Sequence, residues 1–149
     1  MNGYSLALLI GIVTGMRAMM APAAVSWAAR LGYLGLSGWL AFLNGPWVPW
    51  ILTLLAAGEL VTDQLPSTPS RTVPIQFGTR ILVGAVCGAA VSGGLPGALA
   101  GLVGAVIGTF GGRAFRARLA ATFGDDRPAA IAEDAIALAA ALLVVMSVR

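Results

Sequence analysis

Apolar residues gather in five long runs that are separated by short polar or glycine-rich segments. The runs cover residues 4–20 (continuing to 29), 48–65, 73–91, 98–115 and 128–148. A helix needs about 20 apolar residues to cross the roughly 30 Å hydrocarbon core of a bilayer. The pattern therefore predicts five transmembrane helices, or four if the third and fourth runs form one re-entrant pair.

The first run has no charge ahead of it and no convincing signal-peptide cleavage site at its end, so we interpret it as a retained span. Pro22 predicts a bend in it. All four Trp residues fall within residues 27–50, around a glycine-rich segment. Such a group is typical of the membrane–water interface, where we expect a short helix over 37–43.

Three connections join the remaining runs. Residues 66–72 form a proline-rich loop, residues 92–97 a tight turn, and residues 113–127 a basic and then mixed-charge loop.

Composition supports the same fold class. Hydrophobic residues make up 58% of the 149 and charged residues only 10%, whereas soluble domains carry about 25% charged residues. A soluble monomer, a disordered chain, a collagen and a coiled coil are excluded on these numbers. We expect an all-α polytopic membrane helix bundle, with residues 1–149 as a single domain.

The residue types that the chain lacks exclude several kinds of catalytic and metal-binding site. The chain has no His and a single Cys, which excludes His-dependent hydrolases, His-ligated zinc or haem, and an internal disulfide. Cys87 lies in an apolar run and is interpreted as a buried thiol. We expect no cofactor, and we interpret the chain as a non-enzyme. The nine basic residues, all Arg, fit topology signals and internal ion pairs better than nucleic-acid binding.

The distribution of Arg predicts an orientation. In the five-span arrangement one side holds Arg71, Arg113, Arg116, Arg118 and Arg127, and the other holds Arg30 and Arg149. The positive-inside rule then places the N-terminus in the cytoplasm and the C-terminus outside, in the cytoplasmic (inner) membrane of a bacterium. Dual-topology insertion stays open because the margin is modest.

Glycine recurs at every fourth position in several runs. The rows are Gly11-x3-Gly15, Gly84-x3-Gly88, Gly97-x3-Gly101 and Gly104-x3-Gly108-x3-Gly112. This spacing allows close helix packing in lipid. We also expect a homodimer, because five short helices enclose a polar site poorly. The likeness between the segments around Arg17 and Arg113 fits an inverted repeat, as in secondary transporters, or chance.

Ionisable residues lie inside the predicted spans, where each is a functional-site hypothesis. At 1.5 Å per residue, Glu59 and Asp63 lie about 3–10 Å from the cytoplasmic end, Arg80 about 12 Å and the pair at 133–134 about 8 Å. Arg17 is expected near mid-membrane, about 20 Å from that end.

These charges have two interpretations. In the structural one, Glu59 pairs with Arg80 and Glu133 with Arg17, as buried salt bridges that fix helix register. In the functional one, Arg side chains bind an anion while carboxylates carry protons or a coupling cation. The comparable number of Arg argues against a dedicated divalent-cation cage.

Residues 63–72 form the most informative segment. Ser70 or Thr72 can cap the third predicted helix, with Pro74 in its first turn. Together with Arg71 they predict a phosphate or carboxylate site, the alternative being an ordinary capped connector. The full predicted binding set is Arg17, Glu59, Asp63, Ser70, Arg71, Thr72, Gln76, Arg80, Arg113, Glu133 and Asp134, with no catalytic or metal-binding residue.

The chain resembles a known family over nearly its whole length. The matching stretches are Gly15-Met16-Arg17, Pro22-Ala23, Gly58-Glu59-Leu60-Val61, Asp63, Leu65-Pro66, Pro69-Ser70-Arg71-Thr72, Arg80, Gly84-Ala85 and Ala132-Glu133-Asp134-Ala135. They resemble the small bacterial membrane proteins of the "domain of unknown function 4126" family. The resemblance implies a membrane protein and singles out the charged positions, but it implies no activity.

Three functions fit these features. The first is a small transporter or channel for an anionic or lipid-phosphate solute, with membrane lipid and an anionic small molecule or lipid head group as partners. The second is a structural or accessory membrane subunit whose charges serve assembly. The third is a lipid-modifying enzyme with Mg²⁺ on Glu59 and Asp63. This Mg²⁺ site is the only catalytic option that the sequence leaves, and the enzyme is the weakest of the three functions.

Overall fold

The computed structural model describes residues 2–64 and 72–149. In these ranges the chain is helical without strands, which confirms the all-helical class. The helices are α1 (Gly3–Met16), α2 (Met20–Arg30), the 3₁₀ helix η1 (Gly38–Asn44), α3 (Val48–Thr62), α4 (Pro74–Ser92), α5 (Gly94–Phe123) and α6 (Asp126–Ser147).

The number of candidate spans is smaller than the five predicted. Within the described residues, α4, α5 and α6 are long and apolar enough to cross a membrane. The pair of η1 and α3, bent by 73°, makes a fourth if it is counted as one span. A multi-pass helical membrane bundle is therefore supported, with three to four candidate spans.

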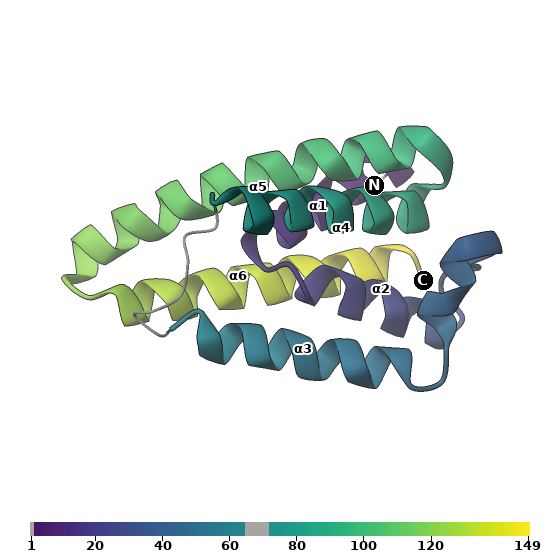
Figure 1. Cartoon of the computed structure of the whole chain (residues 1–149), viewed down its shortest axis with the longest axis horizontal. Coiled ribbons are helices and arrows are strands. Elements are labelled where there is room, and N and C mark those ends of the chain that lie inside the picture. The colour runs from purple at the N-terminus through teal and green to yellow at the C-terminus, as the bar shows by residue number, and fades with distance from the viewer. Residues whose placement is uncertain (1, 65–71) are drawn as a thin grey trace.

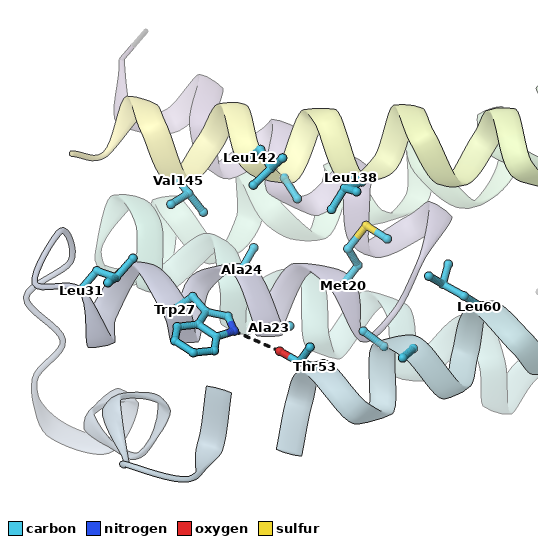
Figure 2. Close-up of a pocket in the computed structure, with 13 residues that line it drawn as sticks. Met20, Ala23, Ala24, Trp27, Leu31, Thr53, Leu60, Leu138, Leu142 and Val145 are labelled. Carbon is cyan, nitrogen blue, oxygen red and sulfur yellow. Dashed lines mark hydrogen bonds between the residues drawn. The ribbon is translucent and has the colours of Figure 1, made fainter. Parts of the chain in front are cut away.

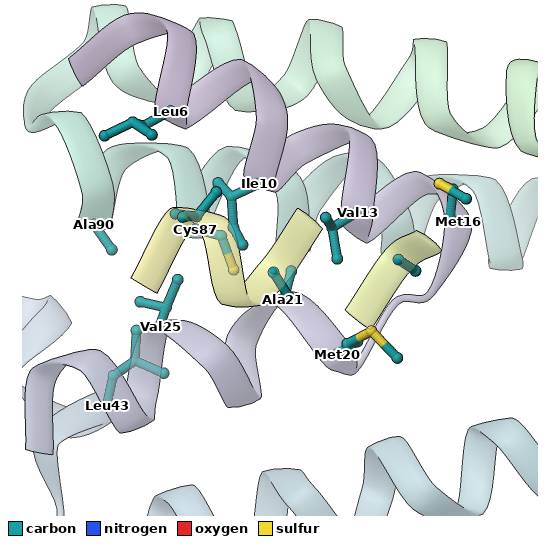
Figure 3. Packing of buried hydrophobic residues seen from close by; sticks show 13 residues of the cluster. Leu6, Ile10, Val13, Met16, Met20, Ala21, Val25, Leu43, Cys87 and Ala90 are labelled. Carbon is teal, nitrogen blue, oxygen red and sulfur yellow. The ribbon is translucent and has the colours of Figure 1, made fainter. Parts of the chain in front are cut away.

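The first apolar run forms a helical hairpin rather than one span. Helix α1 enters the bundle, the chain reverses over residues 17–19, and α2 returns antiparallel to α1 (Figures 1 and 3). The reversal begins at Arg17, whose backbone is extended at φ −140° and ψ 107°. The predicted bend at Pro22 is wrong: Pro22 lies in the first turn of α2, where a missing N–H interrupts no helical hydrogen bond.

This hairpin puts both ends of the chain at one end of the bundle (Figure 1). Gly3 lies against Ser92 at the end of α4, and the Arg149 guanidinium lies 5.8 Å from the Tyr33 ring centroid. The five-span pattern predicts termini on opposite sides of the membrane, whereas here both lie at one end of the bundle, because the first run contributes two antiparallel helices instead of one. The α5–α6 turn lies at the other end.

The glycine rows pack helices within the chain. Gly11 faces the backbone of Gly101, and Gly108 faces the backbone of Ile12, so α1 lies directly on α5. On the other side of α5, a Cβ built on Gly101 would also lie 2.9 Å from the Gly88 Cα of α4. The packing role of the rows is confirmed, whereas the homodimer stays a prediction.

Two predicted connections are shorter than expected. Helix α5 continues to Phe123 and ends at Gly124, which has a left-handed φ of 72°. The expected loop over 113–127 is therefore wrong for most of its length: Arg113, Arg116 and Arg118 are helical, because no Pro interrupts the run. The turn expected over 92–97 shrinks to Gly93, and both Gly93 and the first residue of α5, Gly94, have positive φ. The short helix expected over 37–43 is confirmed as η1, while its interfacial position stays a prediction.

The apolar core lies between the hairpin and its neighbours (Figure 3). Leu6, Ile10 and Val13 of α1 are buried with Val25 of α2 and Cys87 of α4. The buried thiol predicted at Cys87 is confirmed.

Helix α3 stands at the edge of the bundle. Pro49 is its only buried residue. It contacts α2 through Trp27, whose ring meets Trp50 edge-on at 5.0 Å and whose Nε1 donates to Thr53 Oγ1 at 3.0 Å.

Candidate functional site

Arg17 lies at the tip of the hairpin and is completely buried. Its Nε donates to Asp134 Oδ1 at 2.6 Å, and its Nη1 pairs with Asp63. Its Nη2 lies 3.9 Å from Glu133 Oε2. One guanidinium therefore meets carboxylates from the end of α3 and from α6.

Arg116 of α5 shares two of these carboxylates. Its Nη1 donates to Asp63 Oδ2 at 3.0 Å and lies 3.9 Å from Glu133 Oε2. Its Nε donates to Asp126 Oδ1 at 2.9 Å. We call Arg17, Asp63, Arg116, Asp126, Glu133 and Asp134 the charge cluster.

The charge cluster connects the interior to the surface. The side chains of Arg17 and Glu133 are 0% exposed, that of Arg116 is 16% exposed and that of Asp126 is 61% exposed. Among these described residues, four carboxylates face two guanidiniums. Away from water each of these charges needs a partner or a bound proton, since a bare charge is costly there.

Glu59 and Arg80 occupy the break between α1 and α2. The Glu59 carboxylate accepts the backbone N–H groups of Ala18 and Met19, each at 2.8 Å. Arg80 Nη1 donates to the Gly15 carbonyl at 2.9 Å, and its Nη2 lies 3.4 Å from Glu59 Oε1. Each charge opposes the partial charge of the helix end it contacts, and each satisfies backbone groups that the break exposes.

Close helix packing positions these side chains. Gly15 has no side chain, so α5 approaches until Thr109 Oγ1 lies 3.4 Å from the Gly15 carbonyl. The row Gly104, Gly108 and Gly112 faces the same way, and its next member at the four-residue spacing is Arg116. The glycine row that packs on α1 is thus followed by Arg116, whose guanidinium meets Asp63.

The structure brings most of the predicted charged positions together. Arg17, Asp63, Glu133 and Asp134 share the charge cluster, while Glu59 and Arg80 lie directly beside it. The sequence pattern predicts Arg17 well above Asp63 along the membrane normal, but the hairpin tip lies directly beside Asp63. Both ion pairs of the structural interpretation, Glu59–Arg80 and Arg17–Glu133, are present.

The remaining predicted positions lie outside this group. Arg113 is exposed, and its Nη1 lies 3.4 Å from Thr72 Oγ1. Gln76 lies one turn before Arg80 on α4. Thr72 does not cap α4, whose N-cap is Val73 without a side-chain bond, although Pro74 begins the helix as expected. Ser70 and Arg71, and with them the proposed anion loop, lie outside the described residues.

Arg116 and Asp126 are absent from the predicted site. The sequence pattern places both in the loop over 113–127, where Arg116 counts only toward the membrane orientation. The four-residue row that continues from Gly112 was the signal that could have placed Arg116 on the inner face of α5. Glu59 and Asp63 engage different partners, Glu59 the hairpin backbone and Asp63 two Arg side chains, so the geometry gives no support to a shared Mg²⁺ ion.

Comparison with protein families gives one match, the description "Domain of unknown function (DUF4126)", over residues 5–147. No curated protein and no solved structure matches the chain. The family match spans both helices of the hairpin and every member of the charge cluster. On this match the chain belongs to the family of the domain of unknown function 4126.

Proposed function

We propose that this chain is a small membrane transporter for an anionic solute, in which carboxylates of the charge cluster carry a proton or another coupling cation. One observation carries the proposal: Arg17, wholly buried at the non-helical tip of a hairpin, faces three carboxylates. Helix breaks that line polar sites are typical of secondary transporters.

The geometry supports an exchange between carboxylate and solute. Asp63 and Asp134 occupy the Arg17 guanidinium in this structure. A carboxylate that takes up a proton gives up its ion pair, and the guanidinium is then available to an anion. The proton and the anion enter together, so the net charge of the buried site is unchanged and the cost of burying an unpaired charge is avoided.

The proposal includes an orientation in the bacterial cytoplasmic membrane. Arg113, Arg116 and Arg118 lie toward the end of the bundle opposite the chain termini. The positive-inside rule then places that end in the cytoplasm and both termini outside.

Transport is tested in proteoliposomes that contain a pH-sensitive dye. Phosphate, glycerol 3-phosphate, acetate and succinate are added outside, one at a time, and internal acidification is followed. We expect acidification with one class of anion, and a loss of at least tenfold in rate in Asp134→Asn. Arg118→Gln is the control, because Arg118 is exposed and outside the charge cluster. Equal rates in empty and protein-containing vesicles for every anion would reject the proposal.

A structural subunit is the second candidate. It is favoured by the capping of both helix ends at the break, by Glu59 and Arg80. In that case Asp134→Asn changes thermal stability but no flux, and a partner protein copurifies at a fixed ratio.

A further inference from the structure

An apolar groove of about 410 Å³ lies between α2, α3 and α6 (Figure 2). It is lined by Met20, Ala23, Ala24, Trp27, Leu31, Thr53, Ala56, Ala57, Leu60, Leu138, Ala141, Leu142 and Val145. The Trp27 indole N–H donates to the Thr53 hydroxyl at 3.0 Å, and that hydroxyl donates to the Pro49 carbonyl at 2.7 Å. These polar groups are mutually satisfied, so the wall offers only apolar contacts to an occupant.

One end of the groove adjoins the charge cluster on all three walls. Met20 follows Arg17 by three residues on the hairpin, and Leu60 precedes Asp63 by three on α3. Leu138 follows Asp134 by four on α6, which places it on the same face one turn away. One end of the groove therefore lies about one helical turn from the charge cluster along α3 and α6, although no member of the cluster lines it.

The dimensions of the groove favour a hydrocarbon chain over a helix as its occupant. The lining of α6 from Leu138 to Val145 extends about 10 Å, and that of α2 from Met20 to Leu31 about 16 Å. A helix about 10 Å wide would need about 800 Å³ over even the shorter length. A hydrocarbon chain, with carbons that pack about 4 Å from their neighbours, needs about 300 Å³ over the longer one. The volume of 410 Å³ is enough for the hydrocarbon chain but takes only about half of such a helix.

We propose that this groove holds one hydrocarbon chain of a membrane amphiphile whose anionic head group lies at the charge cluster. The assignment of the head group rests on the proposed function, while the assignment of the hydrocarbon chain rests on the groove. The occupant explains why α3 stands apart from α6 with only Pro49 buried: the space between them is filled by lipid. The solutes of the proposed transporter then include anionic amphiphiles, so dodecyl phosphate joins the anions tested in proteoliposomes.

Quenching of Trp27 fluorescence tests the groove directly. Trp39, Trp47 and Trp50 are replaced by Phe, and the purified protein in maltoside micelles is titrated with 12-bromododecyl phosphate. Trp27 lies about 10 Å beyond Met20 along α2, and Met20 itself follows Arg17 by three residues, so a bromine at the far end of the chain reaches the indole. We expect saturable quenching, competed by unbrominated dodecyl phosphate. A phosphate amphiphile brominated beside its head group should quench at least fivefold less.

Matched variants separate groove binding from partition into the micelle. Ala57→Leu fills the groove, whereas Ala139→Leu adds the same bulk to an exposed position of α6 outside the lining. The apparent affinity should fall at least tenfold in Ala57→Leu and stay within twofold in Ala139→Leu. Ala24→Leu repeats the test from α2. Linear quenching, equal in all variants, would overturn the proposal.

Two further outcomes test the anionic head group and the transport function separately. If 12-bromododecyl trimethylammonium binds as tightly as the phosphate, the anionic head group is overturned, and the Arg17 exchange step with it. If the phosphate binds saturably but no anion or amphiphile drives proton entry in proteoliposomes, the groove assignment is upheld and transport is rejected.

Discussion

Glu59 and Arg80 meet 3.4 Å apart across the break in the hairpin, and each completes the end of a different helix. Glu59 accepts the N–H groups of Ala18 and Met19, immediately before the returning helix, and Arg80 donates to a carbonyl at the end of the entering one. An ion pair that the sequence already indicated is thus also a pair of helix caps. This double role satisfies backbone groups that the reversal would otherwise leave without hydrogen bonds inside an apolar bundle.

Replacement of Glu59 by Gln should destabilise the hairpin. Gln keeps one acceptor oxygen but turns an NH₂ group toward a backbone N–H, and it removes the charge opposite Arg80. We expect a loss of about 1–3 kcal/mol, the usual cost of an unsatisfied buried polar group. A lower Tm in detergent, with Arg118→Gln unchanged, would confirm it; the same Tm for wild type and Glu59→Gln would contradict the capping role.

Arg17→Gln should cost more stability than Asp134→Asn. The first change removes the guanidinium that three carboxylates share, whereas the second leaves Arg17 with Asp63 and Glu133. Removal of one partner from a buried ion pair costs about 3–5 kcal/mol. Thermal unfolding of both variants in one detergent checks the order. Equal losses, or a larger loss in Asp134→Asn, would show that Arg17 is not the centre of the charge cluster.

Two glycines of α5 should respond oppositely to Ala. At Gly101 a Cβ would lie 2.9 Å from the Gly88 Cα, whereas at Gly111 nothing lies within 4 Å. We expect Gly101→Ala to reduce the yield of folded protein and the Tm. Gly111→Ala should be neutral, or stabilising by up to about 1 kcal/mol through helix propensity. Size-exclusion profiles and Tm values compare the two, and an unaffected Gly101→Ala would refute backbone contact between α4 and α5.

Both termini should be labelled from the same side of the membrane. Single cysteines at Asn2, Arg118 and Arg149 lie at exposed positions, and the native Cys87 is buried. With a membrane-impermeant maleimide on oriented vesicles, Asn2→Cys and Arg149→Cys should react together and Arg118→Cys from the opposite side. Labelling of the first two from opposite sides would show that the first apolar run crosses the membrane once.

Much of the candidate site could be predicted from single positions. An acid or Arg inside an apolar run is informative wherever it occurs, because the cost of its burial demands a partner. The pairs Glu59–Arg80 and Arg17–Glu133 follow from this rule. Arg116 could not be assigned in the same way, because its role depends on where α5 ends. A helix boundary is set by Gly124 and by packing rather than by hydropathy.

The sequence by itself determined the environment and the contacts of this protein. Its apolar composition requires a bilayer, its four-residue glycine rows require close helix packing, and its few buried charges require one another. Tertiary structure decided the path of the chain. A mainly apolar stretch of 26 residues (4–29) suits one long helix or two short antiparallel ones equally well, because hydropathy does not indicate where a chain reverses. What selects the hairpin is the capping of its tip by Glu59 and Arg80, which lie on α3 and α4, far from the tip along the chain.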